Sequence, residues 1–196
     1  MKFYQIFSLA IIATFYIAYF LKALVLTLKG IKVNQMGFGD KSGKTKIIEQ
    51  VLKSVTFFIV PIQLGSAFLL LPLQTESPNY LQNIGMAISI CGTICFIAAM
   101  LTMGKSWRAG IAAGESTNFI KHGIYRISRN PAFLGFDLFY VGILLILPGI
   151  IHAIAICFVV TMFHLQILEE EKSLIEKFGD EYRKYKSETK RYFLFF

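Results

Sequence analysis

The segment Lys121–Gly135, K-H-G-I-Y-R-I-S-R-N-P-A-F-L-G, marks a border in this chain of 196 residues. A polar, basic loop precedes it, and after it comes a long apolar run in which Asp137 is the one Asp, Glu, Lys or Arg. Gly123 permits a tight turn, and Pro131 suits the first position of a helix, where an N–H group is not needed. Four polar side chains are therefore expected near the positive end of this helix dipole: Tyr125, Arg126, Arg129 and Asn130. A plain membrane-entry loop is the alternative interpretation.

The composition places the chain in a bilayer. Hydrophobic residues make up 55% of it and the mean hydropathy is +0.58, well above a soluble domain. The net charge of +8 does not indicate a nucleic-acid partner, because the Lys and Arg residues fall between apolar runs rather than on one face. Cys91 and Cys95 have no Cys or His partners at ligand spacing, so we expect packing roles and no metal site.

The apolar runs predict an all-α integral membrane bundle of about five transmembrane helices. A run of 18 or more apolar residues is long enough to cross a bilayer. The expected spans cover residues 3–28, 55–73, 80–103, 131–147 and 149–168. Pro61 should kink the second span, and small residues in the third, including Gly85 and Gly92, suit close helix packing.

The last two spans form a predicted helical hairpin. Residues 131–168 as one helix would be about 57 Å long, against about 30 Å of hydrocarbon. The chain should therefore fold back at Pro148-Gly149. Residues 169–190 should then leave the membrane as a charged helix that Gly179 breaks or bends, and residues 45–53 should form a short amphipathic helix.

The distribution of positive charge predicts the orientation. Residues 29–53, 104–130 and 169–196 hold six, five and seven of the 20 Lys and Arg residues, whereas residues 74–79 and the hairpin turn hold none. Because Lys and Arg stay on the cytoplasmic side, we expect the C-terminus and any active site beside these loops to be cytoplasmic.

Four motifs follow one another along the second half of the chain. They are Gly123-Ile124-Tyr125, Arg129-Asn130-Pro131-Ala132-Phe133-Leu134-Gly135, Glu170-Glu171-Lys172-Ser173-Leu174, and the tail from Phe178 to Tyr185. In this order they resemble the isoprenylcysteine carboxyl methyltransferase family of small membrane enzymes, and the resemblance covers about residues 105–193. It implies one structural domain, with N-terminal transmembrane helices over residues 1–104 and a methyltransferase core over residues 105–196.

The resemblance also implies a cofactor and its site. The implied cofactor is S-adenosylmethionine. The implied methyl acceptor is a lipophilic small molecule or a lipidated molecule, and membrane lipids are further expected partners. By family position, the cofactor-binding residues are Thr117, Asn118, Phe119, Ile120, Tyr125, Asn130, Pro131, Ala132, Phe133 and Glu170.

Two positions depart from the family pattern. The family histidine is Asn130 here, and a substrate-side arginine, four residues before the cofactor glutamate, is Gln166. Arg108 is the second substrate-side candidate, either as part of the pocket wall or as an interfacial anchor beside Trp107. Arg129 and Asp137 are the candidate catalytic residues, and no general base is evident.

Three function classes follow from these features. The first is a membrane methyltransferase, with O-methylation as the expected reaction. The second is an NADPH-dependent membrane reductase of related fold, although no basic pocket for a 2′-phosphate is evident. The third is a non-catalytic membrane protein that retains the fold, for which Asn130 and Gln166 are the best support. The methyl acceptor and the oligomeric state do not follow from the sequence.

Overall fold

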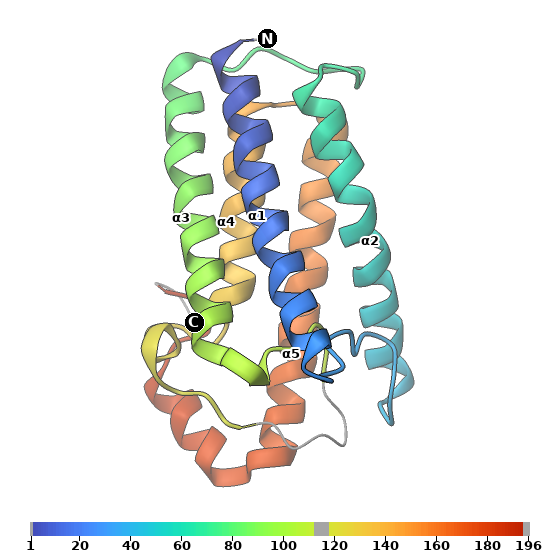
Figure 1. Cartoon of the computed structure of the whole chain (residues 1–196), viewed down its shortest axis with the longest axis vertical. Helices are drawn as coiled ribbons and strands as arrows, with labels where there is room; N and C mark the ends of the chain where they lie inside the picture. Colours follow the sequence, from blue (N-terminus) through green and yellow to red (C-terminus); the bar gives the residue numbers. More distant parts are fainter. Residues whose placement is uncertain (1, 112–117, 194–196) are drawn as a thin grey trace.

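The computed structural model describes residues 2–111 and 118–193, and every extended regular element among them is a helix. Five long helices stand side by side as a bundle (Figure 1). They are α1 (Phe3–Leu28), α2 (Gly43–Ala67), α3 (Asn79–Met103), α4 (Pro131–Ile146) and α5 (Ile150–Glu188), with short 3-10 helices η1 (Gly104–Ser106) and η2 (Gly123–Arg126) between α3 and α4.

The all-α membrane architecture is confirmed. Four helices, α1, α2, α3 and α5, are long and apolar enough to cross a bilayer. Helix α4 has 16 residues and is shorter, at about 24 Å for a rise of 1.5 Å per residue. The count of five crossings therefore stays a prediction.

The second span differs from its expected bounds. Helix α2 begins at Gly43, where the Ser42 hydroxyl caps it by accepting a 3.1 Å hydrogen bond from the Thr45 N–H. The predicted amphipathic helix 45–53 is thus the first part of α2, and the helix continues through Pro61 without interruption. It ends at Ala67, and Leu69, two residues later, adopts a left-handed φ of 56° with which a right-handed helix does not continue.

The predicted hairpin is present, and a loop at the same end contacts it. Helix α4 ends at Ile146 and α5 starts at Ile150, on the two sides of Pro148-Gly149. Residues 68–78 cross this turn with two backbone hydrogen bonds, from the Thr75 N–H to Pro148 O (3.2 Å) and from the Ile150 N–H to Leu73 O (3.3 Å). The described parts of the three basic segments lie at the opposite end of the bundle (Figure 1).

Helices α3 and α4 pack backbone to backbone. A Cβ atom added to Gly85 would lie 2.6 Å from the Gly142 carbonyl oxygen, and one added to Gly92 would lie 2.7 Å from that of Gly135. Such distances are too short for any side chain, so the small residues are required for this contact. The expectation of close packing is confirmed for Gly85 and Gly92.

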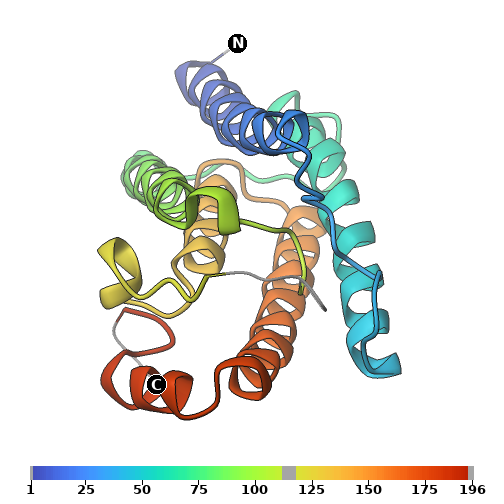
Figure 2. The ribbon, with the colours of Figure 1, turned by 60° about the horizontal axis from the view of Figure 1, so that its bottom comes forward.

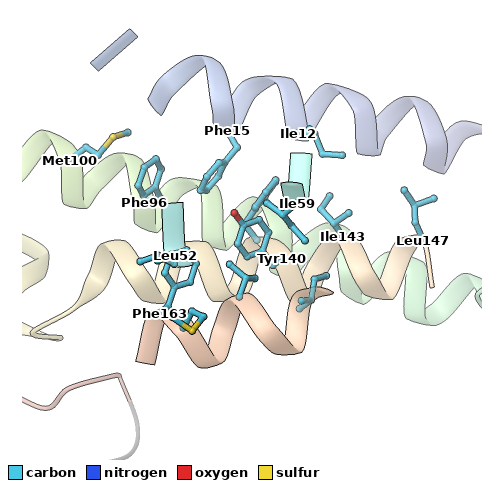
Figure 3. Close-up of a cluster of buried hydrophobic side chains, with 14 of the residues drawn as sticks. Ile12, Phe15, Leu52, Ile59, Phe96, Met100, Tyr140, Ile143, Leu147 and Phe163 are labelled. Carbon is cyan, nitrogen blue, oxygen red and sulfur yellow. The ribbon is translucent and has the colours of Figure 1, made fainter. Parts of the chain in front are cut away.

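Aromatic side chains form the centre of the core (Figure 3). Phe15 of α1 stacks on Phe96 of α3 and on Phe139 of α4, with ring centroids 4.6 Å and 4.1 Å apart. Tyr140 is fully buried and stacks on Phe163 of α5 at 6.1 Å. Helix α1 is therefore joined to the hairpin by aromatic packing.

Helix α5 has the predicted break at Gly179. Gly179 has a φ of 54°, which an L-amino acid with a side chain rarely adopts. The part of α5 after Gly179, drawn in red in Figure 2, turns away from the axis of the long orange part. This turn returns the tail to η2 and to the start of α4.

Candidate active site

A cavity of about 1140 Å³ lies inside the bundle and extends to the end that carries the basic loops. All five long helices contribute to its wall, together with residues after α3 and residues 118–120. Its polar part contains Glu170, Gln166, Arg129 and Asn130. Its apolar part reaches Phe57 and Phe58 on the outward side of α2. These two residues are 72% and 60% exposed.

Most residues named from the sequence line this one cavity. The set comprises Arg108, Asn118, Phe119, Ile120, Tyr125, Arg129, Asn130, Ala132, Phe133, Gln166 and Glu170. Pro131 is buried at the first position of α4 and accepts a hydrogen bond from the Cys95 thiol through its carbonyl, but it does not line the cavity. Asp137 lines a different, smaller cavity. Thr117 lies outside the described residues.

Glu170 belongs to a buried polar cluster that joins α5 to α2. The Gln166 side-chain amide donates to Glu170 at 3.0 Å and to Glu49 of α2 at 3.5 Å. Glu49 is fully buried and pairs with Lys41 at 2.7 Å. It also accepts hydrogen bonds from the backbone N–H groups of Gly37 (2.7 Å) and Ile111 (2.8 Å). The Glu49 carboxylate thus connects two loops and helix α2 to the part of α5 that carries Gln166 and Glu170.

Glu171, the next residue, belongs to a separate network. Its buried carboxylate receives hydrogen bonds from Arg129 (3.1 Å), Arg191 (3.0 and 3.1 Å) and the Asn130 side-chain amide (3.2 Å). Hydrogen bonding to Glu171 raises the pKa of Arg191. This network fixes the C-terminal tail to the start of α4.

Arg129 is held by that network. Besides Glu171, its guanidinium group donates to the carbonyl oxygens of Lys186 and Thr189. These contacts give Arg129 a structural role at the rim of the cavity. Its candidate catalytic role stays a prediction.

The first turn of α4 lies at the cavity wall. Pro131 has no N–H group, and the Asn130 N–H donates to the Ser128 hydroxyl at 3.1 Å. The N–H groups of Ala132 and Phe133 belong to the first turn, where no intrahelical acceptor exists. Both residues line the cavity, so this helix end offers donors to an anionic group.

Aromatic side chains complete the polar part of the cavity. Tyr125 is buried, and its carbonyl accepts a hydrogen bond from the Tyr185 hydroxyl. Burial raises the pKa of Tyr125 well above its usual value, so its hydroxyl stays neutral. Phe119 stacks on Phe178 with ring centroids 5.1 Å apart. These rings line the same cavity as Glu170.

Residues 107 and 108 lie in the cavity wall, as one of the two sequence interpretations proposed. Trp107 is buried and packs edge-on against Tyr19 of α1, with ring centroids 5.4 Å apart. The Arg108 guanidinium group donates to the Lys105 carbonyl at 2.7 Å. Both side chains therefore lie where the loop after α3 meets the cavity.

Sequence reasoning missed the contributions of the N-terminal half. Tyr16, Tyr19 and Phe20 of α1 line the cavity, and Glu49 supports it from α2. No motif marks these positions. The one available signal was Glu49 itself, an acidic residue on the apolar face of the amphipathic segment 45–53.

The comparisons with known proteins agree with the motifs. Residues 84–176 match the model of the isoprenylcysteine carboxyl methyltransferase (ICMT) family. Protein-S-isoprenylcysteine O-methyltransferase A of Arabidopsis thaliana is 34% identical over 109 residues, which cover 54% of this chain and 55% of that protein. The Saccharomyces cerevisiae protein-S-isoprenylcysteine O-methyltransferase is 32% identical, covering 54% and 46%. The chain spans about half the length of these relatives.

A solved structure shows the same fold. The eukaryotic intramembrane Ras methyltransferase ICMT superposes with a TM-score of 0.54 at 20% identity, covering 79% of this chain and 53% of that one. The family match begins inside α3, earlier than residue 105, so it includes the α3–α4 contact. The resemblance carried by the sequence motifs is therefore confirmed for residues 84–176, which match the model of the isoprenylcysteine carboxyl methyltransferase family.

Proposed function

We propose that this protein is an S-adenosylmethionine-dependent membrane methyltransferase that acts on a lipophilic acceptor, with O-methylation as its reaction. One observation carries the proposal. A single cavity joins a polar part, beside Glu170 and the N-terminus of α4, to an apolar part that reaches the outer side of α2. A water-soluble donor and a lipid-soluble acceptor have to meet in such a space.

The residues present fit the chemical groups of the donor. The Glu170 carboxylate suits its hydroxyl or ammonium groups, and the backbone N–H groups of Ala132 and Phe133 suit its carboxylate. The Phe119 ring, stacked on Phe178, offers a surface for an adenine ring, and Tyr125 offers an aromatic face to a cation. When bound, the donor supplies an electrophilic methyl group.

The protein contributes chiefly by alignment. Methyl transfer is an in-line displacement, and holding two reactants in the reactive geometry can contribute roughly 7–11 kcal/mol at best. The dense packing of α1, α4 and α5 around Phe15, Tyr140 and Phe163 gives the cavity rigid walls. A carboxylate acceptor needs no general base, since its oxygen is already a nucleophile.

The outer part of the cavity is proposed as the entrance for the acceptor. Its wall includes three largely exposed phenylalanines, which are Phe20 of α1 (62% exposed), Phe57 of α2 (72%) and Phe58 of α2 (60%). Because these helices are apolar enough to cross a bilayer, their exposed rings face lipid. The relatives named above are isoprenylcysteine O-methyltransferases, and a prenyl chain is the type of ligand that this surface accepts.

The polar end of the cavity is proposed to face the cytoplasm, since the basic segments lie there. A cysteine-free variant with Glu76→Cys or Ser187→Cys tests this orientation. The two single cysteines should react with a membrane-impermeant reagent from opposite sides, with Ser187→Cys protected in sealed right-side-out cells. Labelling of both from the same side would contradict it.

Ligand-dependent melting of the detergent-purified protein tests the proposed cofactor. A ligand at 100 times its dissociation constant stabilises a folded protein by about 2.7 kcal/mol. S-adenosylmethionine should raise the melting temperature by several degrees, whereas NADPH should not. A shift with NADPH alone would support the reductase, and no shift with either would support a non-catalytic protein.

A further inference from the structure

A second cavity lies outside the proposed active site, between the outer sides of α4 and α5. Its volume is about 480 Å³, and it is lined by Asp137, Val160, Thr161, His164 and Tyr192. Tyr192 belongs to the C-terminal tail, which the Glu171–Arg191 contact holds in place. None of these five residues lines the large cavity.

Asp137 has an unsatisfied carboxylate oxygen in this cavity. Its Oδ1 atom is buried and has no hydrogen-bond partner among the described residues. A buried carboxylate without a partner is strongly unfavourable in an apolar environment, and most ionisable residues in membrane helices pair with a specific group. The missing partner is therefore expected to be a bound donor.

The cavity lies close to the boundary between apolar and polar surroundings. Asp137 is six residues after the start of α4, or about 9 Å along the helix. His164 is five residues before Glu169, where the charged part of α5 begins, or about 8 Å. Both residues lie within the expected spans, about 8–9 Å from the polar ends, so a lipid headgroup has to reach a short way below the hydrocarbon surface to contact them.

The lining groups select a hydrogen-bond donor with positive charge. Asp137 supplies a carboxylate, and the Thr161 hydroxyl, which donates to the Cys157 carbonyl at 2.8 Å, keeps its lone pairs as acceptors. Tyr192 and the His164 ring are 3.0 Å apart and satisfy each other. Burial raises the pKa of Tyr192 to about 12, so its hydroxyl adds no negative charge at neutral pH.

We propose that this cavity binds the primary ammonium headgroup of a membrane lipid, with phosphatidylethanolamine as the ligand. Its ammonium group donates to Asp137 and to Thr161, while Val160 contacts the adjoining methylene groups. A choline headgroup has no N–H donor and cannot form these bonds. This site is separate from the proposed methyl-transfer site and does not depend on it.

Native mass spectrometry tests the proposal. The protein is transferred from micelles with equimolar phosphatidylethanolamine and phosphatidylcholine, and the ratio of the two retained lipids is measured. One hydrogen bond to a charged group corresponds to about tenfold in affinity, so the ratio should favour phosphatidylethanolamine about tenfold. Asp137→Asn keeps the shape of the side chain and should bring the ratio close to one. Asp180→Asn, which changes an exposed carboxylate on the tail side of α5, should leave it high.

Two further measurements distinguish a membrane lipid from its free headgroup, and this cavity from the proposed active site. Free phosphoethanolamine at the same concentration should not displace the lipid, because it lacks acyl chains; equal displacement would overturn the assignment to a membrane lipid. Glu170→Gln should keep the lipid ratio while weakening donor binding, which distinguishes this site from the proposed active site. A wild-type ratio near one, or an unchanged ratio in Asp137→Asn with a native melting temperature, would overturn the proposal.

Discussion

The side-chain amide of Gln166 donates a 3.0 Å hydrogen bond to Glu170, one helical turn further along α5. The same amide lies 3.5 Å from Glu49, which belongs to α2 and precedes the family segment that begins at residue 84. The orientation of the proposed cofactor carboxylate thus depends on a helix that no family motif covers. Glu49 is a positioning residue in this arrangement.

Removing the Glu49 carboxylate should destabilise the protein. Glu49→Ala removes the ionic partner of the buried Lys41 ammonium group, which keeps the Gln35 carbonyl, and the acceptor of the Gly37 and Ile111 N–H groups. Breaking a buried ion pair from one side costs about 3–5 kcal/mol, so the melting temperature in detergent should fall by many degrees. Asp180→Ala is the control, since its ion pair with Arg183 is exposed and should contribute little. A Glu49→Ala variant that melts with the wild type would remove Glu49 from this role.

Gln166→Arg should improve methyl transfer to a prenyl-cysteine carboxylate. Arginine at this position would lie beside Glu49 and Glu170, and its planar group keeps further donors for a carboxylate. A charge-assisted hydrogen bond is worth about 1.5–3 kcal/mol, so kcat/KM for a farnesylated cysteine analogue should rise about tenfold. Gln166→Met, of similar length but without polar atoms, should give no gain. If the wild type methylates the farnesylated cysteine analogue efficiently and Gln166→Arg does not raise kcat/KM, this prediction is wrong and a prenyl-cysteine carboxylate is the favoured acceptor.

The adjacent carboxylates Glu170 and Glu171 should behave differently when each is changed to glutamine. Glu170→Gln should weaken binding of S-adenosylmethionine by about tenfold or more, because one charge-assisted hydrogen bond is lost, while the melting temperature stays near that of the wild type. Glu171→Gln should lower the melting temperature, since Arg129 and Arg191 lose a buried ionic partner. Calorimetry and thermal melting of both variants check this. Equal effects on binding and stability in the two variants would show that the assignment of roles is wrong.

The α3–α4 contact should tolerate no added methyl group. In Gly92→Ala the new Cβ would lie 2.7 Å from the Gly135 carbonyl oxygen, so the helices must separate. Overpacking of this kind costs about 1–3 kcal/mol and should lower the melting temperature by roughly 2–10 °C. Gly43→Ala is the matched control, because no atom lies within 4 Å of its added Cβ and its backbone is helical. Equal melting temperatures for Gly92→Ala and Gly43→Ala would contradict close packing of α3 against α4 at Gly92.

Local patterns predicted the hairpin and the break in α5 well. Pro148-Gly149 divides an apolar run too long for one span, and Gly179 stands in an otherwise helical charged segment. The start of α2 was misplaced, because an amphipathic segment and an apolar segment with different patterns form one continuous helix from Gly43. Its end was misplaced because residues 68–73 are apolar yet non-helical, and hydropathy alone does not distinguish the two.

The candidate site was predictable only where the family motifs cover it. The family motifs placed Tyr125, Asn130 and Glu170 on one cavity. Glu49 is 117 residues from Gln166 in the sequence, and Arg191 is 20 residues from Glu171, so neither pairing follows from local periodicity. Asp137 is one helical turn from Phe133, and residues at this spacing share a helix face, so the sequence did not predict that Asp137 lines the outer cavity and Phe133 the large one.

Transfer of a radiolabelled methyl group tests the central proposal most directly. Purified protein is incubated with methyl-labelled S-adenosylmethionine and a membrane lipid extract supplemented with farnesylated cysteine, and label in the organic phase is counted against the Glu170→Gln variant. Methyl transfer to a lipophilic acceptor predicts label that accumulates with time for the wild type and falls about tenfold or more in Glu170→Gln. Organic-phase label no higher than in a protein-free control, from a wild-type sample that still binds the donor, would contradict the account.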